Sequence, residues 1–76
     1  MTTEVRIPKL GMSMTEGVLA EWLVPEGASV EEGSPIYVLE TDKAGQEIDA
    51  PASGVLRIIA ETGETYEVGA LIARIE

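Results

Sequence analysis

Lysine is the side chain in this sequence best suited to covalent chemistry, and it occurs only twice, as Lys9 and Lys43. A lysine amine that has lost its proton is a nucleophile and can be acylated. The chain has no His and no Cys, which excludes a Ser-His-Asp triad, a thiol nucleophile and a His-ligated metal. An isolated surface lysine is usually a solvated charge, and we assign that role to Lys9. The case for Lys43 depends on the residues around it.

The charge balance limits the possible partners. Fourteen acidic residues against five basic ones give a net charge of −9. This is the wrong sign for holding phosphate backbones, so we expect no nucleic-acid partner. Acid pairs such as Asp42 and Asp49 have no basic or metal-binding companion in the sequence, which disfavours a hydrolase. An acidic surplus is typical of a soluble protein, and we expect the isolated domain to be monomeric.

The length of 76 residues predicts a single domain, spanning residues 1–76, with its folded part running from about Val5 to Ile75. Its apolar runs are far shorter than the roughly 18 residues needed to cross a bilayer, so we expect no membrane contact. The segment Met1–Glu4 lacks the basic stretch and apolar run of a signal peptide. We therefore expect the bacterial cytoplasm, or the mitochondrial matrix for a processed eukaryotic chain.

Short bursts of period-two hydrophobicity predict an all-β chain of seven or eight strands. Val18–Val24 and Val55–Ile59 are apolar or β-branched runs of strand length, and Ile36–Glu40 alternates. Gly- and Pro-containing turns separate these runs, as at Pro25–Gly27 and Pro51–Gly54. No helical stripe is long enough to compete.

An internal repeat organises these strands. When Gly17 is placed over Gly54, a shift of one residue in the following turn aligns Gly27 with Gly63, and the spacing then holds to Glu40 and Glu76. The paired glycines fit backbone sites that need a positive φ or a close chain approach. Two such halves, each unable to bury its own apolar face, are expected to pack as a pseudo-symmetric sandwich or flattened barrel.

The two halves differ at one place, which is where Lys43 lies. After Glu40 the chain continues through Thr41-Asp42-Lys43-Ala44 into another strand-like segment, Gln46–Ala50, whereas the second half stops at Glu76. Two strands joined by a short polar turn make a hairpin. The repeat therefore predicts one exposed hairpin with Asp42 and Lys43 at or beside its tip, and no equivalent lysine in the second half.

The stretch Glu40–Ala44 (ETDKA) is similar to the lipoylation motif of lipoyl domains, the swinging-arm carriers of 2-oxo acid dehydrogenase complexes. The resemblance covers essentially the whole chain. Ile7–Gly17 resembles the first strand and loop of that family, Gly27 and Gly33 its turn glycines, and Ala50–Leu56 its central crossover. A bare Asp-Lys-Ala tripeptide would mean nothing, but this motif is centred between two matching halves.

The resemblance implies a flattened barrel-sandwich hybrid of two four-stranded antiparallel sheets with pseudo-two-fold symmetry. A lipoate-attaching enzyme would join lipoic acid to Lys43 through an amide, with Glu40, Asp42 and Ala44 contributing to recognition of the hairpin. The cofactor would take an acyl group from a thiamine-diphosphate decarboxylase, deliver it to an acyltransferase core and be reoxidised by dihydrolipoamide dehydrogenase. The domain itself would be a non-catalytic carrier, and its parent chain a dihydrolipoamide acyltransferase.

Two other functions remain open at this point. Biotin carriers resemble lipoyl domains and also modify a hairpin lysine, although their lysine usually lies between methionines, whereas Asp42 and Ala44 flank Lys43 here. An unmodified interaction module of the same fold is the second alternative, and the lysine hairpin argues against it. The sequence leaves open which 2-oxo acid complex is served: pyruvate, 2-oxoglutarate, branched-chain or acetoin-type.

Several side chains near the motif have two possible roles. In the family the loop Leu10–Glu16 lies near the hairpin and helps the decarboxylase recognise its carrier, so Met12 and Met14 either form an adaptable contact surface or cap the end of the barrel. Family members commonly have β-branched residues where this chain has Gly45-Gln46, which predicts a looser outgoing strand. The aromatic residues are expected in the core or at its edge: Trp22, Tyr37 and Tyr66.

Overall fold

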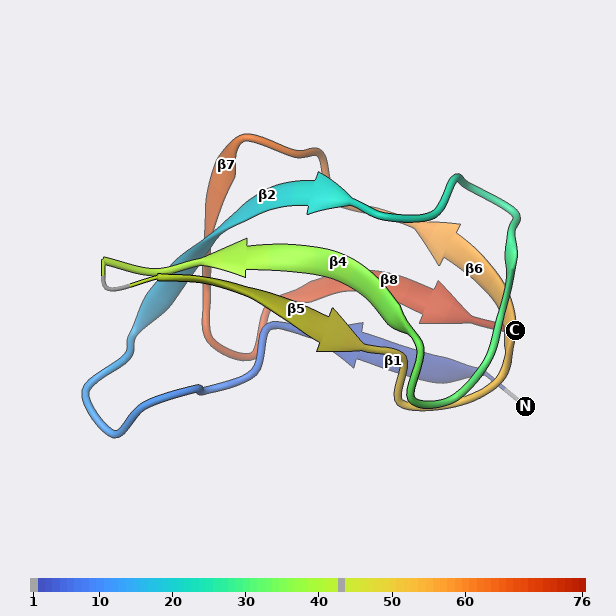
Figure 1. Ribbon diagram of the computed structural model, residues 1–76, viewed down its shortest axis with the longest axis horizontal. Coiled ribbons are helices and arrows are strands. Elements are labelled where there is room, and N and C mark those ends of the chain that lie inside the picture. Colours follow the sequence, from blue (N-terminus) through green and yellow to red (C-terminus); the bar gives the residue numbers. More distant parts are fainter. Residues whose placement is uncertain (1, 43) are drawn as a thin grey trace.

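The structure, a computed structural model, describes residues 2–42 and 44–76. These residues form eight strands and no helix, so the predicted all-β class is confirmed. In chain order the strands are β1 (Thr3–Arg6), β2 (Glu16–Trp22), β3 (Ser29–Val30), β4 (Pro35–Glu40), β5 (Gly45–Asp49), β6 (Gly54–Ile58), β7 (Glu64–Glu67) and β8 (Leu71–Ile75). They make two four-stranded antiparallel sheets packed face to face (Figure 1).

The two sheets are related by the repeat seen in the sequence. Their strand orders are β5-β4-β2-β7 and β1-β8-β6-β3. Each order becomes the other when β2 is exchanged for β6, β4 for β8, β7 for β3 and β5 for β1. The predicted pseudo-two-fold symmetry is therefore confirmed. The short strands β3 and β7 each lie in the sheet built mainly from the opposite half, so neither half completes a sheet alone.

Aligned glycines occupy matching places in the two halves. Gly27 has a φ of 81° and donates its N–H to the carbonyl of Leu56 at 2.8 Å. Its counterpart Gly63 has a φ of 83° and donates to the carbonyl of Leu19, the residue aligned with Leu56, at 2.7 Å. A positive φ of this size favours glycine because it has no Cβ. Each of these turns thus hydrogen-bonds to the first long strand of the other half, Gly27 to β6 and Gly63 to β2.

The core lies between the sheets, and its described residues are apolar apart from one phenol. Alternation along β4 directs Tyr37 and Leu39 into it, and both are fully buried. Ile36 is buried too, although strict alternation places it with half-exposed Val38 on the other face. The register shift between Pro35 and Tyr37 explains this departure. The buried apolar side chains of the described residues are Val5, Ile7, Leu19, Val30, Ile36, Tyr37, Leu39, Ala50, Leu56, Ala60, Ile72, Ala73 and Ile75.

The three aromatic residues have the predicted core and core-edge positions. Tyr37 is fully buried, and Trp22 and Tyr66 are partly buried against the core. The rings of Trp22 and Tyr37 pack with centroids 5.4 Å apart and a tilt of 57°. The indole N–H of Trp22 donates to the carbonyl of Ala60 at 3.2 Å. Among the described residues the Tyr37 hydroxyl has no hydrogen-bond partner, and burial raises its pKa to about 12.

The unpartnered hydroxyl gives a stability prediction. Tyr37→Phe is expected to raise the free energy of unfolding at neutral pH by about 1 kcal/mol, because a buried polar group without a partner is removed. Above pH 10 the unfolded chain releases the phenol proton while the folded chain retains it, so wild-type stability falls as pH rises toward 12. The gap between variant and wild type should widen by about 1.4 kcal/mol per pH unit in that window. Urea denaturation at pH 7, 10 and 11 measures both effects.

Tyr66→Phe is the matched control for this prediction. The Tyr66 hydroxyl accepts the N–H of Glu61 at 3.1 Å and donates to the carbonyl of the same residue at 3.0 Å. Its removal is expected to lower stability by about 0.5–1 kcal/mol at neutral pH, the opposite sign. Equal destabilisation of both variants would show that the Tyr37 hydroxyl has a partner.

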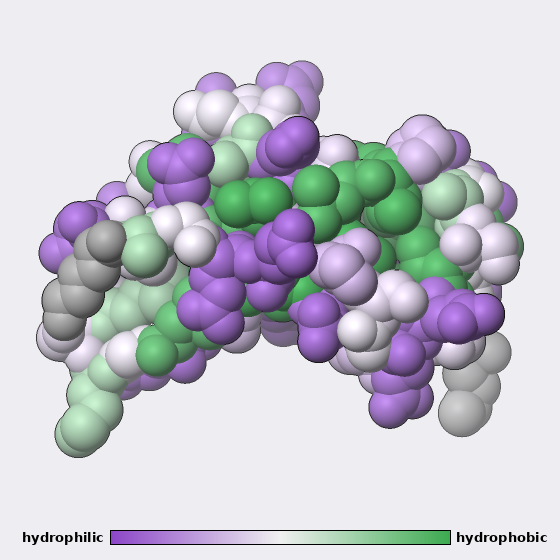
Figure 2. Space-filling view, in the orientation of Figure 1, coloured by the Kyte–Doolittle hydropathy of each residue, from purple (hydrophilic) through white to green (hydrophobic). Residues whose placement is uncertain are grey.

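The surface combines apolar and acidic regions. Figure 2 shows an apolar strip over β2 and the end of β6, bordered by hydrophilic side chains. Leu23 and Ile59, which directly follow these two strands, are 38% and 49% exposed. Within residues 2–42 and 44–76, no helix is long and apolar enough to span a membrane.

Candidate functional site

The predicted hairpin is formed by β4 and β5, and it lies at the end of the sandwich opposite the C-terminus (Figure 1). Glu40 and Gly45 form its last register pair. Beyond that pair, Thr41 donates its backbone N–H to the carbonyl of Ala44 at 2.9 Å and its hydroxyl to the same oxygen at 3.2 Å. These two hydrogen bonds join Thr41 to Ala44 and so close the turn. Lys43, the predicted attachment residue, lies outside the described residues.

The other three predicted site residues are described, and the structure brings them together. Glu40, Asp42 and Ala44 are exposed, and all three line one side of a cleft beside the hairpin. Their recognition by an attaching enzyme stays a prediction. Lys9, by contrast, is an exposed residue of the loop after β1, in agreement with the solvated role assigned to it.

The loop between β1 and β2 forms the opposite side of this cleft, and its two methionines have different roles. Met12 is 96% exposed, and the loop extends away from the two sheets at the hairpin end (Figure 1). Met14 is partly buried and packs against the core, and its sulfur accepts the backbone N–H of Leu10 at 3.2 Å. Met14 therefore caps the barrel, and Met12 is free for contact with another molecule.

Gly17 allows the loop to pack this closely. It is buried, and a Cβ added to it would lie 2.8 Å from Cδ1 of Leu39 and 3.1 Å from Cε of Met14. A side chain at this position would force Leu39 and Met14 to shift, so glycine suits the packing of Met14 over the start of β2. The close approach expected for this glycine is confirmed, and its counterpart Gly54 has both a close approach and a φ of 153°.

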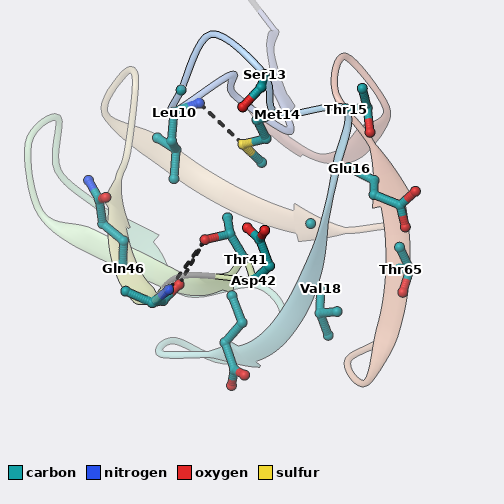
Figure 3. Close-up of a pocket in the computed structure, with 14 residues that line it drawn as sticks. Leu10, Ser13, Met14, Thr15, Glu16, Val18, Thr41, Asp42, Gln46 and Thr65 are labelled. Carbon is teal, nitrogen blue, oxygen red and sulfur yellow. Dashed lines mark hydrogen bonds between the residues drawn. The ribbon is translucent and has the colours of Figure 1, made fainter.

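Loop and hairpin enclose a cleft of about 730 Å³, within the roughly 300–1,000 Å³ typical of small-molecule sites. In Figure 3 the side chains of Leu10 and Met14 extend from the loop toward Thr41 and Asp42 of the hairpin. The floor is the start of β2, with half-exposed Val18. The described lining residues are Leu10, Gly11, Ser13, Met14, Thr15, Glu16, Gly17, Val18, Glu40, Thr41, Asp42, Ala44, Gln46 and Thr65.

The charges of the lining disfavour an anionic guest. Glu16, Glu40 and Asp42 contribute carboxylates, and none of the described lining residues is cationic. An anionic ligand would therefore be repelled. The described residues also hold no group of three or more His, Cys, Asp or Glu side chains able to bind a metal ion.

Three lining residues were missed by sequence reasoning as members of a cleft: Val18, Gln46 and Thr65. Val18 pairs in register with Glu40 on one side and Thr65 on the other, so these side chains form a row across three strands. Gln46 pairs with Leu39 and lies on the outgoing strand of the hairpin. The row could have been found only from the strand register, which the sequence did not provide.

The outgoing strand of the hairpin is regular from its first residue. β5 begins at Gly45, directly opposite Glu40, and Gln46 continues the ladder. The greater looseness expected at these two positions stays a prediction about motion. Backbone ¹⁵N relaxation should give lower order parameters at Gly45 and Gln46 than in β6, because glycine restricts the backbone least. Values as high as those of β6 would contradict it.

Comparison with known proteins finds a matching family and several similar proteins. The sequence profile of the Biotin_lipoyl family, described as biotin-requiring enzyme, matches residues 3–75. A succinyltransferase component of the 2-oxoglutarate dehydrogenase complex from Bartonella vinsonii is 44% identical over the whole chain, which covers 19% of that protein.

Two further relatives belong to a pyruvate dehydrogenase complex and to an acetoin cleaving system. An acetyltransferase component of the pyruvate dehydrogenase complex from Corynebacterium glutamicum is 43% identical over 96% of this chain and 11% of its own length. An acetyltransferase component of the acetoin cleaving system from Pseudomonas putida is 47% identical over 88% of this chain and 18% of its own length. All three names describe dihydrolipoyllysine-residue proteins. The chain thus spans a fifth or less of the relatives it matches.

Proposed function

This chain belongs to the Biotin_lipoyl family, and from that premise we propose that it is a lipoyl carrier domain in which Lys43 bears an amide-linked lipoate. The observation that carries the proposal is the position of the ETDKA motif, which forms the connection of the β4–β5 hairpin at one end of the sandwich. The residues on either side of Lys43, Asp42 and Ala44, are exposed. All 76 residues are assigned to this single domain, which agrees with the family match over residues 3–75.

The residues around the hairpin fit such a group. Beside it lies a cleft with apolar Leu10 and Met14 on its loop wall, Val18 on its floor and no cation among its described lining residues. That environment suits an uncharged hydrocarbon chain ending in a sulfur ring. Bound lipoate supplies disulfide redox chemistry and a thiol that carries acyl groups.

The domain's own contribution is position. The rigid sandwich fixes the base of the arm, and tethering replaces diffusion with an effective concentration of about millimolar. We assign no catalytic step to the domain, because the reactions would belong to its partner enzymes. These are a lipoate-attaching enzyme, a thiamine-diphosphate decarboxylase, an acyltransferase core and dihydrolipoamide dehydrogenase. We place the domain, monomeric in isolation, in the bacterial cytoplasm or the mitochondrial matrix.

Lipoate is preferred to biotin on two grounds. Asp42 and Ala44 flank the lysine, in place of the methionines usual in biotin carriers. The relatives described above are dihydrolipoyllysine-residue proteins from three different complexes. Because those complexes act on different substrates, the resemblance does not favour one 2-oxo acid over another.

Mass spectrometry tests the proposal directly. The protein is incubated with a lipoate-attaching enzyme, ATP and lipoate, and in parallel with a biotin ligase, ATP and biotin. We expect a lipoyl addition, located by peptide mapping on Lys43, and little or no biotin. Biotin on Lys43 in place of lipoate would assign the protein to carboxylase chemistry. No addition by either enzyme to a folded sample would favour an unmodified interaction module.

A further inference from the structure

The two walls of the cleft differ in character, and this difference suggests a use. The loop wall presents the apolar side chains of Leu10 and Met14, whereas the hairpin wall presents polar groups from Thr41, Asp42 and Gln46 (Figure 3). A guest with a hydrocarbon end and an amide end would satisfy both walls. An acylated lysine has both features: its amide lies closer to the protein chain, and the hydrocarbon of the acyl group lies beyond the amide.

The covalent connection decides which guest reaches the cleft first. Asp42 and Ala44 both line it, and Lys43 is bonded to each of them through the chain. Any group carried by Lys43 is therefore tethered beside the cleft. With an effective concentration of about 1 mM, even a site with a dissociation constant of about 1 mM would be filled about half of the time.

The loop wall is held by contacts within the domain. The Leu10 N–H donates to the Met14 sulfur, and Met14 packs over Gly17 and the core. The apolar surface is thus formed in advance, which lowers the entropic cost of binding. Across the cleft, the Gln46 carboxamide offers both a donor and an acceptor to an amide.

We propose that this cleft is a resting site for the acyl-like arm on Lys43, in which Leu10 and Met14 hold the hydrocarbon chain and ring and Gln46 binds the linking amide. The inference rests on the proposed function, because it requires a modified Lys43. In this view the arm divides its time between a docked and an extended state. A partner enzyme competes with the cleft for the arm, and the depth of docking sets how much of the arm is exposed to reagents in solution.

The test uses the intact domain, lipoylated enzymatically and labelled with ¹⁵N and with ¹³C in the methionine methyls. Mass spectrometry first confirms the lipoyl addition; a chain that gains none contradicts the carrier function itself, independently of the cleft. In the modified protein we expect chemical-shift changes at the Leu10 and Gln46 amides and the Met14 methyl, relative to the unmodified protein. Changes confined to the immediate neighbours of Lys43 would overturn the proposal.

A second measurement uses dithiothreitol, which attacks as its thiolate, and two variants that carry the same added charge. Leu10→Glu introduces a charge at the loop wall, whereas Met12→Glu introduces the same charge at a nearby position outside the cleft lining. A docked fraction of about one half predicts that dithiothreitol reduces the lipoyl disulfide about twofold more slowly in wild type than in Leu10→Glu. Met12→Glu should match wild type. Equal rates in all three proteins would show that the arm does not dock.

Discussion

Lys43→Arg is expected to abolish lipoyl attachment altogether, even under conditions that fully modify the wild-type chain. Amide formation needs an amine without its proton. A lysine amine in water has a pKa of about 10.4, so about one molecule in a thousand is neutral near pH 7.4, and the attaching enzyme can draw on that fraction. A guanidinium, with a pKa above about 12, stays charged and is a poor nucleophile. The substitution keeps the positive charge and so isolates the chemistry.

Lys9→Arg provides the matched control, because it changes the only other lysine in the same way. It should be modified to completion, since Lys9 lies in the loop after β1 and not in the hairpin. Intact-mass spectra of the three proteins after equal incubation make the comparison. A lipoyl addition that persists in Lys43→Arg and disappears in Lys9→Arg would move the attachment site to the loop and remove the basis of the proposed function.

Gly54→Ala is expected to be the most damaging of the single changes to the fold, lowering the free energy of unfolding by about 3–5 kcal/mol. Gly54 has a φ of 153°, where side chains are strained. An added Cβ would collide with the backbone carbonyl oxygen of Glu76 and lie 2.8 Å from Cγ2 of Ile75. Because this obstacle includes backbone, relieving it would require Glu76 and the end of β8 to shift. The neighbouring bonds between Val55 and Glu76, both 2.8 Å long, would be broken.

Gly33→Ala separates the two causes. Gly33 also has a positive φ, 90°, but a Cβ there meets nothing within 4 Å. It should lose only the strain, about 1–2 kcal/mol. A 76-residue domain is expected to have roughly 4–11 kcal/mol of stability in total, so Gly54→Ala should lose a much larger share of it than Gly33→Ala. Equal urea midpoints for the two variants would show that the contact with Glu76 contributes nothing.

Most of the fold was predictable because its signals are local. Period-two alternation identifies strands, and the equal spacing of Gly27 to Gly33 and of Gly63 to Gly69 reveals the repeat. The exchange of β3 and β7 between sheets was not predictable, since it depends on pairing between residues far apart in the chain. Alternation also left open which face of Ile36–Glu40 is buried, and the burial of both Ile36 and Tyr37 depends on a register irregularity between Pro35 and Tyr37.

The site was predictable only as a motif. The ETDKA stretch indicated the hairpin, and Glu40, Asp42 and Ala44 do gather there. The opposite wall was open to two interpretations, because the position of Met14 depends on a hydrogen bond from Leu10 and on the missing side chain of Gly17. Such contacts have no periodicity, so spacing alone cannot separate a capping methionine from an exposed one.

The exchange of β3 and β7 has a consequence for synthesis on the ribosome. When β2 and β4 have been translated, β7, which pairs with β2 at the edge of their sheet, has not yet been made. Likewise, β3 is translated before β6, the strand with which it pairs. Contacts that join distant parts of a chain form late and slowly. We therefore expect no stable hairpin to appear on the nascent chain before the second half has emerged. An enzyme that acts on the folded hairpin then meets only finished domains.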